Sequence, residues 1–185
     1  MAGDSAQPRR DELATMALNM CERRGLYIAA AESLTGGLLA DAFVRIPGAS
    51  RVFLGSAVTY DIAAKAAILG VDAGLLAAGG AVQADVAAQM AAGTAGLYTR
   101  PGREGHVIGL STTGVAGPGP DGDKPAGLVY VGLAIPDATG SLAVQTYELH
   151  LNGSREAVRL STVLHVLRHL TTSLSALPPV APRAR

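Results

Sequence analysis

The order of apolar and polar positions predicts alternating helices and strands. Apolar side chains recur at helical spacing in some segments and form short runs of strand length, bounded by glycine or proline, in others. The pattern predicts helices over about 13–24, 38–45, 61–69, 72–78, 83–98 and 155–174, and strands over about 26–31, 52–60, 106–112, 127–135 and 142–151. Residues 1–10 and 175–185 lack this pattern and are expected to be disordered, which leaves one domain at 11–174.

Three of the expected strands end in a turn that is polar or rich in glycine, at residues 33–37, 60–65 and 112–119. In a layered sheet with parallel strands, such turns gather along one edge, where these folds bind their ligands. The last two strands are joined by a short turn and should pair antiparallel. We therefore expect an α/β fold with a mixed, largely parallel sheet and one pocket at its edge.

Composition excludes several kinds of partner and site. Lys plus Arg and Asp plus Glu both number 15, so no basic surplus favours nucleic acid, and aromatic residues make up only 4%. Cys21 is the only cysteine, which excludes an internal disulfide and a multi-cysteine zinc site. Residues 1–12 lack the apolar core of a secretory signal, and no apolar run is long enough for a membrane span. We expect a cytoplasmic protein without a membrane or nucleic-acid partner.

The first strand-to-helix turn supports two interpretations. Glu32, Ser33, Thr35, Gly36 and Gly37 lie between the strand and the helix that follows it. In the functional interpretation, Ser33 is a nucleophile and the glycine N–H groups at the helix N-terminus bind an anion. In the structural interpretation, Ser33 or Thr35 only caps the helix.

Three charged residues near the other turns are further candidates. Lys65 is one of two lysines against thirteen arginines, and lysine, unlike arginine, can lose its proton in a buried site. Arg155 and Arg159 lie four residues apart at the start of the last helix, where cations oppose the helix dipole unless an anion is near. A solvated helix face remains the alternative in each case.

The loop at 113–125 carries four glycines and does not fit the known nucleotide-binding motifs. Residues 117–124 differ from the phosphate-binding P-loop, because no Ser or Thr follows Lys124 and a strand comes next where the motif requires a helix. The dinucleotide fingerprint fails for the same lack of a helix.

Several segments, taken together, resemble the C-terminal domain family of the competence/damage-inducible protein CinA. They are residues 31–37 (AESLTGG), 58–60 (VTY), 64–65 (AK), 69–71 (LGV), 113–118 (TGVAGP) and 124–130 (KPAGLVY), in this order and spacing. The resemblance runs from about residue 11 to 172. It implies a three-layer α/β/α sandwich, commonly a homo-oligomer.

The resemblance also implies an activity and its residues. Characterised stand-alone members are amidohydrolases that convert the nucleotide substrate nicotinamide mononucleotide to nicotinate mononucleotide and ammonia. The family's catalytic serine, tyrosine and lysine fall on Ser33, Tyr60 and Lys65. The substrate-binding residues that we expect are Glu32, Thr35, Gly36, Gly37, Thr113, Gly114, Arg155 and Arg159.

The residue types suit carboxamide hydrolysis, which needs a nucleophile, a base and a group that stabilises the oxyanion. No GxSxG motif and no histidine occur in the three turns, so Lys65 is the available base for Ser33. Its pKa would have to fall from about 10.4 to roughly 7–8. N–H groups after Ser33 or around Gly114 are candidates for the oxyanion hole, and Tyr60 for a proton relay. The reaction requires no metal and no cofactor.

The chain departs from the family pattern at three places. Asp61-Ile62 replaces the usual Ser-Asn, Gln83 replaces a serine, and Ser154 replaces an aspartate before Arg155. The sequence therefore leaves open a binding domain that has lost turnover, an amidase for another carboxamide, and a purely structural role.

Overall fold

The computed structural model describes residues 6–178, and the elements other than the first helix lie within a few residues of their expected ranges. The elements in chain order are α1 (Gln7–Arg24), β1 (Tyr27–Glu32), α2 (Leu38–Val44), the 3₁₀ turn η1 (Ala49–Arg51), β2 (Phe53–Val58), α3 (Ile62–Leu69), α4 (Ala73–Gly79), α5 (Ala84–Tyr98), β3 (Val107–Gly114), β4 (Leu128–Pro136), β5 (Leu142–His150) and α6 (Arg155–Ala176).

The five strands form one mixed sheet in the order β2-β1-β3-β4-β5. β1 pairs in parallel with both β2 and β3, and the pairs β3–β4 and β4–β5 are antiparallel. The mixed sheet is confirmed, with parallel and antiparallel pairings in equal number. At the carboxyl end of β1, Glu32 is in register with Val58 on one side and Thr112 on the other. The three predicted turns therefore meet at one edge of the sheet.

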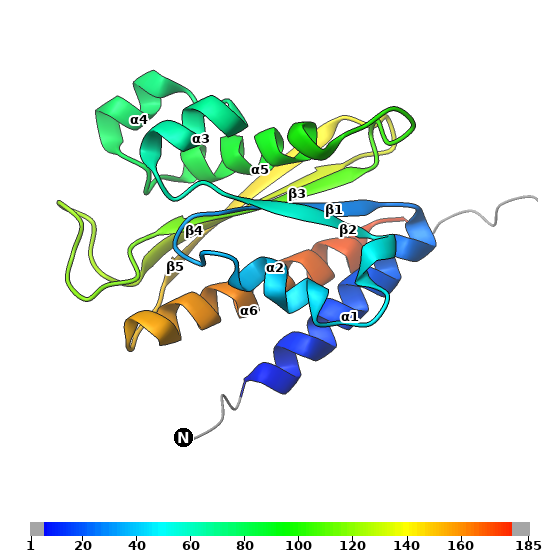
Figure 1. Ribbon diagram of the computed structural model, residues 1–185, viewed down its shortest axis with the longest axis horizontal. Helices are drawn as coiled ribbons and strands as arrows, with labels where there is room; N and C mark the ends of the chain where they lie inside the picture. The colour runs from blue at the N-terminus through cyan, green and yellow to red at the C-terminus, as the bar shows by residue number, and fades with distance from the viewer. Residues whose placement is uncertain (1–5, 179–185) are drawn as a thin grey trace, which may run out of the picture.

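Helices cover both faces of the sheet, as the α/β/α prediction requires. Figure 1 shows α1, α2 and α6 on one face and α3, α4 and α5 on the other. The larger apolar core lies under the first group and includes Phe43, Ile108 and Leu167. A smaller core that includes Leu69, Val86 and Met90 lies under the second group.

Close packing of α5 against β3 fixes the middle of the sheet. A Cβ added at Gly109 of β3 would collide with the carbonyl group of Ala91, so only glycine allows this approach. Next to it, the buried Ser111 donates from Oγ to the carbonyl oxygen of Ala87 at 2.6 Å. This contact holds the part of β3 that leads to the site.

The expected disorder at the two ends was partly wrong. α1 begins at Gln7, with Pro8 in its first turn, and Arg10 is only 2% exposed. Proline is favoured at the first position of a helix, and this signal marks the true start. α6 runs to Ala176, and Arg24 donates to the carbonyl oxygens of Leu177 and Pro178 at 3.3 Å. The rest of both predicted segments, 1–5 and 179–185, lies outside the described residues.

Candidate active site

Ser33 and Lys65 lie side by side at the carboxyl edge of the parallel strands. Ser33 directly follows β1 and is 8% exposed, and Lys65, from the first turns of α3, is fully buried. Lys65 Nζ lies 3.1 Å from Ser33 Oγ. It also donates to the backbone carbonyl oxygens of Thr59 at 2.6 Å and Tyr60 at 3.4 Å. The lysine is thus held with its amine directed at the serine hydroxyl.

Burial gives the Lys65 amine the properties of a base. Removal from water lowers the pKa of Lys65 from 10.5 to about 8, because burial disfavours the charged form, and the negative charge of Asp61 opposes this shift. A sizeable share of the lysine is therefore neutral at slightly alkaline pH. The neutral amine can accept the proton of the Ser33 hydroxyl.

The backbone around Ser33 is fixed by β3. Ser33 N–H donates to the carbonyl oxygen of Thr112 at 3.0 Å. Thr112 Oγ1 lies 2.8 Å from Thr35 Oγ1, and both threonines are fully buried. The N–H groups of Leu34 and Thr35, directly after the serine, donate to no acceptor within residues 6–178. Two unused donors thus lie beside the serine.

The Glu32 carboxylate does not face a substrate. It accepts hydrogen bonds from the N–H groups of Gly37, Leu39 and Ala40 and from Ser56 Oγ, all at 2.9–3.0 Å. Its side chain is fully buried. The expected substrate contact is wrong, because the carboxylate caps α2 from inside the protein. The capping role proposed for Ser33 or Thr35 belongs to Glu32 instead.

The N–H groups of the paired glycines are also occupied. Gly36 N–H donates to the Ser33 carbonyl oxygen at 3.1 Å, and Gly37 N–H donates to Glu32. Gly37 has a φ of 102°, a conformation that favours glycine. The glycines therefore shape the turn, and the anion contact expected from their N–H groups is not available in this geometry. Thr35 likewise uses its hydroxyl on Thr112.

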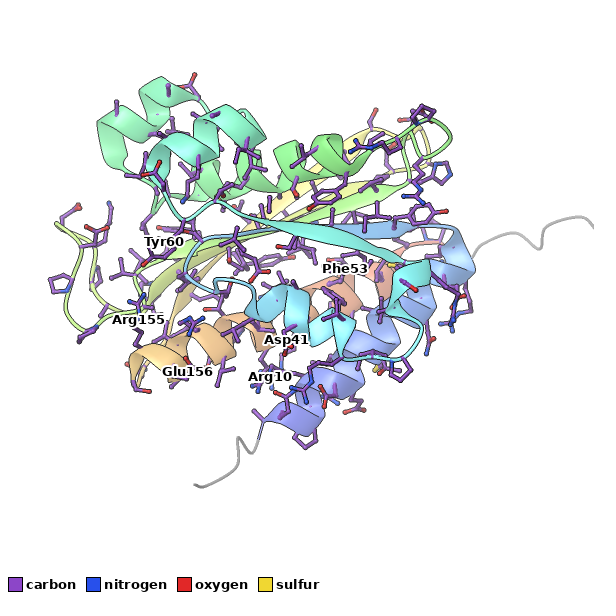
Figure 2. The ribbon with its side chains drawn as sticks, viewed as in Figure 1. Arg10, Asp41, Phe53, Tyr60, Arg155 and Glu156 are labelled. Carbon is purple, nitrogen blue, oxygen red and sulfur yellow. The ribbon has the colours of Figure 1, made fainter. Side chains whose placement is uncertain are left out.

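Arg155 and Tyr60 close one side of a pocket next to the serine. Arg155 donates from Nη1 to the Gly117 carbonyl oxygen at 2.6 Å and from Nη2 to Tyr60 Oη at 3.2 Å. Figure 2 shows both side chains at the same end of the molecule, next to the loop between β3 and β4. The pocket has a volume of about 270 Å³ and is lined by Leu34, Tyr60, Arg155 and residues 114–121. Leu34, directly after Ser33, is the lining residue next to the serine.

Two of the expected roles change with this geometry. Tyr60 is 64% exposed, and its phenol contacts Arg155, not the Ser33–Lys65 pair, so the expected proton relay is not formed. Arg159 turns inward: Nε donates to the Leu34 carbonyl oxygen at 2.9 Å and Nη2 to that of Thr35 at 3.0 Å. Arg159 thus holds the turn after Ser33, and Arg155 is the arginine of the pocket.

The remaining expected residues divide in the same way. Thr113 is buried and donates from Oγ1 to the Ala81 carbonyl oxygen at 2.7 Å, which ties β3 to the segment before α5. Gly114 lines the pocket, and a Cβ there would collide with Leu128 and Val129. Two residues that differ from the family pattern lie outside these contacts. Ile62 is the half-exposed first residue of α3, and Gln83 donates to the Gly80 carbonyl oxygen at 2.7 Å.

The sequence-based prediction missed three contributors. Thr59 supplies the carbonyl oxygen nearest to Lys65, Thr112 fixes the Ser33 backbone, and Ser56 completes the shell of Glu32. In the sequence, these residues could have been recognised only as polar residues near the end of an apolar strand, close to a turn. Their roles depend on pairing between strands and not on local sequence.

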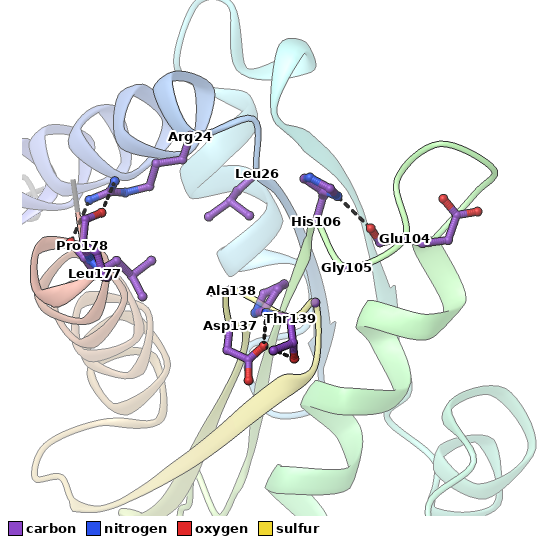
Figure 3. Close-up of a pocket in the computed structure, with 12 residues that line it drawn as sticks. Arg24, Leu26, Glu104, Gly105, His106, Asp137, Ala138, Thr139, Leu177 and Pro178 are labelled. Carbon is purple, nitrogen blue, oxygen red and sulfur yellow. Dashed lines mark hydrogen bonds between the residues drawn. The ribbon is translucent and has the colours of Figure 1, made fainter. Parts of the chain in front are cut away.

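A second pocket lies at the opposite edge of the sheet. It has a volume of about 460 Å³ and lies between the end of α1, the start of β3 and the β4–β5 turn (Figure 3). Arg24, His106 and Asp137 contribute polar groups. Leu26 and His106 come before β1 and β3, whereas Ser33 follows β1. This pocket contains none of the predicted site residues.

Two features are absent from residues 6–178. No group of three or more His, Cys, Asp or Glu side chains lies close enough together to hold a metal ion. No helix in this part of the chain combines the length and the apolar character that crossing a membrane requires.

Comparison with known proteins gives consistent matches. The family model described as the CinA C-terminal domain matches residues 10–174. A CinA-like protein from Frankia casuarinae is 44% identical over 168 residues, which are 91% of this chain and 36% of that protein. A CinA-like protein from Dictyoglomus thermophilum is 39% identical over 163 residues, 88% of this chain and 37% of the relative. The chain thus spans little more than a third of these relatives.

Solved structures share the fold. The competence/damage inducible protein CihA from Agrobacterium tumefaciens superposes with a TM-score of 0.79 at 33% identity, covering 90% of this chain and 95% of that one. The competence damage-inducible protein A from Klebsiella pneumoniae gives a TM-score of 0.81 at 28% identity, covering 91% and 99%.

Proposed function

This chain belongs to the family of CinA C-terminal domains, and we propose that it is an amidohydrolase that converts nicotinamide mononucleotide to nicotinate mononucleotide and ammonia. One observation carries the proposal. Lys65 Nζ, buried and with a pKa lowered to about 8, lies 3.1 Å from Ser33 Oγ. This is the arrangement of a serine nucleophile with a lysine base. The substrate is the one that the family resemblance implies.

We propose the following order of steps. Neutral Lys65 takes the proton from Ser33 Oγ, which attacks the carboxamide carbon and forms a C–O bond. The N–H groups of Leu34 and Thr35 are the donors available for the oxyanion, because they bind nothing else in the described chain. The C–N bond then breaks, and the leaving nitrogen takes the proton from Lys65 and departs as ammonia. Water hydrolyses the ester on Ser33, with Lys65 again as the base.

The pocket supports a substrate with an anionic group. Arg155 is the arginine that lines it, and it is anchored through Gly117 and Tyr60. A guanidinium binds phosphate oxygens with two parallel hydrogen bonds. We place the 5′-phosphate at Arg155, with the carboxamide towards Ser33.

We further propose that the enzyme acts in the cytoplasm, forms a homo-oligomer and uses no cofactor. Large apolar side chains at 49–51% exposure, on Val58 and Ile62 near the site, support a contact between subunits. Light scattering of the purified protein tests this part, and a monomer at micromolar concentration would contradict it.

The first experiment measures ammonia release from nicotinamide mononucleotide, with nicotinamide as the phosphate-free comparison. We expect turnover of the mononucleotide, and a loss of roughly 10²- to 10⁴-fold in Ser33→Ala and Lys65→Met. Ser50→Ala, at an exposed position, and Lys124→Met, the other lysine, are matched controls that should retain turnover. A protein that binds the mononucleotide without releasing ammonia would instead be a binding domain.

A further inference from the structure

We propose that Glu32 is a positioning residue of the reaction: its buried carboxylate holds the turn that carries Ser33 and the unused N–H groups after it. This inference rests on the proposed function, since it concerns the same nucleophile. It gives Glu32 a role that differs from the substrate contact expected from the sequence.

The contacts of the carboxylate are numerous and entirely internal. Oε2 accepts from the N–H groups of Gly37 at 2.9 Å and Leu39 at 3.0 Å. Oε1 accepts from Ala40 N–H and from Ser56 Oγ, both at 2.9 Å. All four partners are donors, which is the environment that a negatively charged carboxylate requires. Each carboxylate oxygen accepts two hydrogen bonds, and the side chain has no exposed surface, so Glu32 cannot contact a substrate.

α2 depends on this carboxylate for its start. The helix has seven residues, and its N-cap, Gly37, has no side chain to satisfy the free N–H groups. Glu32 reaches them from the end of β1, while Leu38 N–H donates to the Thr35 carbonyl oxygen. A negative charge at this end also interacts favourably with the helix dipole. Without the carboxylate, the N–H groups of Gly37, Leu39 and Ala40 lose their acceptor inside the protein.

The turn after β1 is thereby fixed at both ends. Glu32 holds its exit into α2, and Arg159 donates to the carbonyl oxygens of Leu34 and Thr35. Within residues 6–178, these contacts leave the N–H groups of Leu34 and Thr35 without an acceptor. Loss of the Glu32 contacts should therefore displace the nucleophile and the oxyanion donors together.

The main chain of Glu32 extends the same control to the base. Its carbonyl oxygen accepts from Thr59 N–H at 2.9 Å, and the Thr59 carbonyl oxygen accepts from Lys65 Nζ at 2.6 Å. The backbone of Glu32, which precedes Ser33, is thus connected to Lys65 through Thr59. A substitution of Glu32 changes its side-chain contacts and keeps these main-chain groups, so the role of the side chain can be tested separately.

The test uses Glu32→Gln, which keeps the shape but replaces one acceptor oxygen with an NH₂ group that cannot accept. The probe is phenylmethylsulfonyl fluoride: Ser33 Oγ bonds to sulfur, fluoride leaves, and the proton goes to Lys65. Labelling is followed by intact mass, with Ser33→Ala as the blank. Ammonia release and thermal unfolding are measured alongside. Asp41→Asn, an exposed carboxylate on the same helix, is the matched control.

We expect Glu32→Gln to remain folded, to label at least 10-fold more slowly and to lose kcat with little change in KM, while Asp41→Asn behaves like the wild type. A folded Glu32→Gln that labels at the wild-type rate would overturn the proposal. If that variant does not fold, Ser56→Ala decides: slower labelling supports the role, and an unchanged rate overturns it. Labelling needs no nucleotide, so an error about the substrate alone would leave this result intact.

Discussion

Lys65 Nζ lies 3.1 Å from Ser33 Oγ, although the two residues are 32 positions apart in the chain. β1 ends just before Ser33, and β2, which pairs with it in parallel, leads into the helix that carries Lys65. The amine therefore reaches the hydroxyl across the carboxyl edge of the sheet. Burial of this lysine has consequences for pH dependence and for stability that experiments can measure.

Activity should rise with pH. Only the neutral amine accepts a proton, and the pKa of Lys65 is lowered to about 8, so the neutral fraction grows as pH passes through that value. We expect the turnover number for nicotinamide mononucleotide to be half-maximal near pH 8 and to level off above pH 9. A pH-independent rate from 6 to 9 would contradict the role of Lys65 as base.

Asp61→Asn should move this profile to lower pH. The charge of Asp61 raises the pKa of Lys65 against the effect of burial, and its removal lowers that pKa further. Asp61 also caps α3 by accepting from Ala64 N–H, a role that asparagine fills equally well. Asp72→Asn is the matched control, because Asp72 caps α4 in the same way. An identical shift in both variants would show that the effect does not act through Lys65.

Lys65→Met should change how stability depends on pH. The folded state binds the Lys65 proton less tightly than the unfolded state, because the pKa falls from 10.5 to about 8 on folding. Between these values the free energy of unfolding of the wild type should rise with pH relative to the variant, by at most about 3 kcal/mol. Below pH 8 the difference should level off. Urea unfolding of both proteins at pH 7, 9 and 10.5 measures it, and parallel curves would contradict it.

Tyr60→Phe should leave the chemical step largely intact. Among the described residues, the phenol hydrogen-bonds to Arg155 and to neither Ser33 nor Lys65. Removal of the hydroxyl deletes one of the hydrogen bonds that hold Arg155. We therefore expect a higher KM for the mononucleotide and a kcat within about threefold of the wild type. A large fall in kcat with unchanged KM would show that Tyr60 moves into the reaction centre when substrate binds.

The two arginines of α6 should have different effects. Arg155→Ala should lower kcat/KM for nicotinamide mononucleotide by roughly 10- to 100-fold, the effect of one charge-assisted contact, with little effect on a phosphate-free substrate. Arg159→Ala should lower kcat/KM for both and reduce the free energy of unfolding by about 1–3 kcal/mol, because the carbonyl groups of Leu34 and Thr35 lose their donor. Equal effects of the two variants on both substrates would refute this division.

Two glycines of α5 provide a test of the packing. A Cβ at Gly93 would collide with the carbonyl group of Leu69, whereas a Cβ at Gly96 meets nothing within 4 Å. Gly93→Ala should cost about 1–3 kcal/mol of stability, and Gly96→Ala should add about 0.5–1 kcal/mol. Thermal unfolding measures both changes. If both variants shift the unfolding temperature in the same direction, Gly93 of α5 does not pack against the end of α3 at Leu69.

Much of the fold follows from local pattern. The ranges of the strands and of α3 to α5 agree with the structure within a few residues, because burial on one face imposes the periodicity of each element. The errors lie at the chain ends, where the proline that starts α1 and the contacts of Arg24 extend order beyond the periodic segments.

The sequence by itself determined the order of the elements, the strand-to-turn units and the residue types for a serine–lysine pair. Only the tertiary structure decided how each polar group is used. Glu32, the glycine N–H groups and Arg159 looked like ligands of a substrate, yet each is saturated by partners within the protein. The reason is physical: a hydrogen-bonding group serves whichever partner the fold brings to about 3 Å, and distant segments supply those partners. Burial withdraws the Glu32 carboxylate from the surface, and burial of Lys65 lowers the pKa of its amine to about 8.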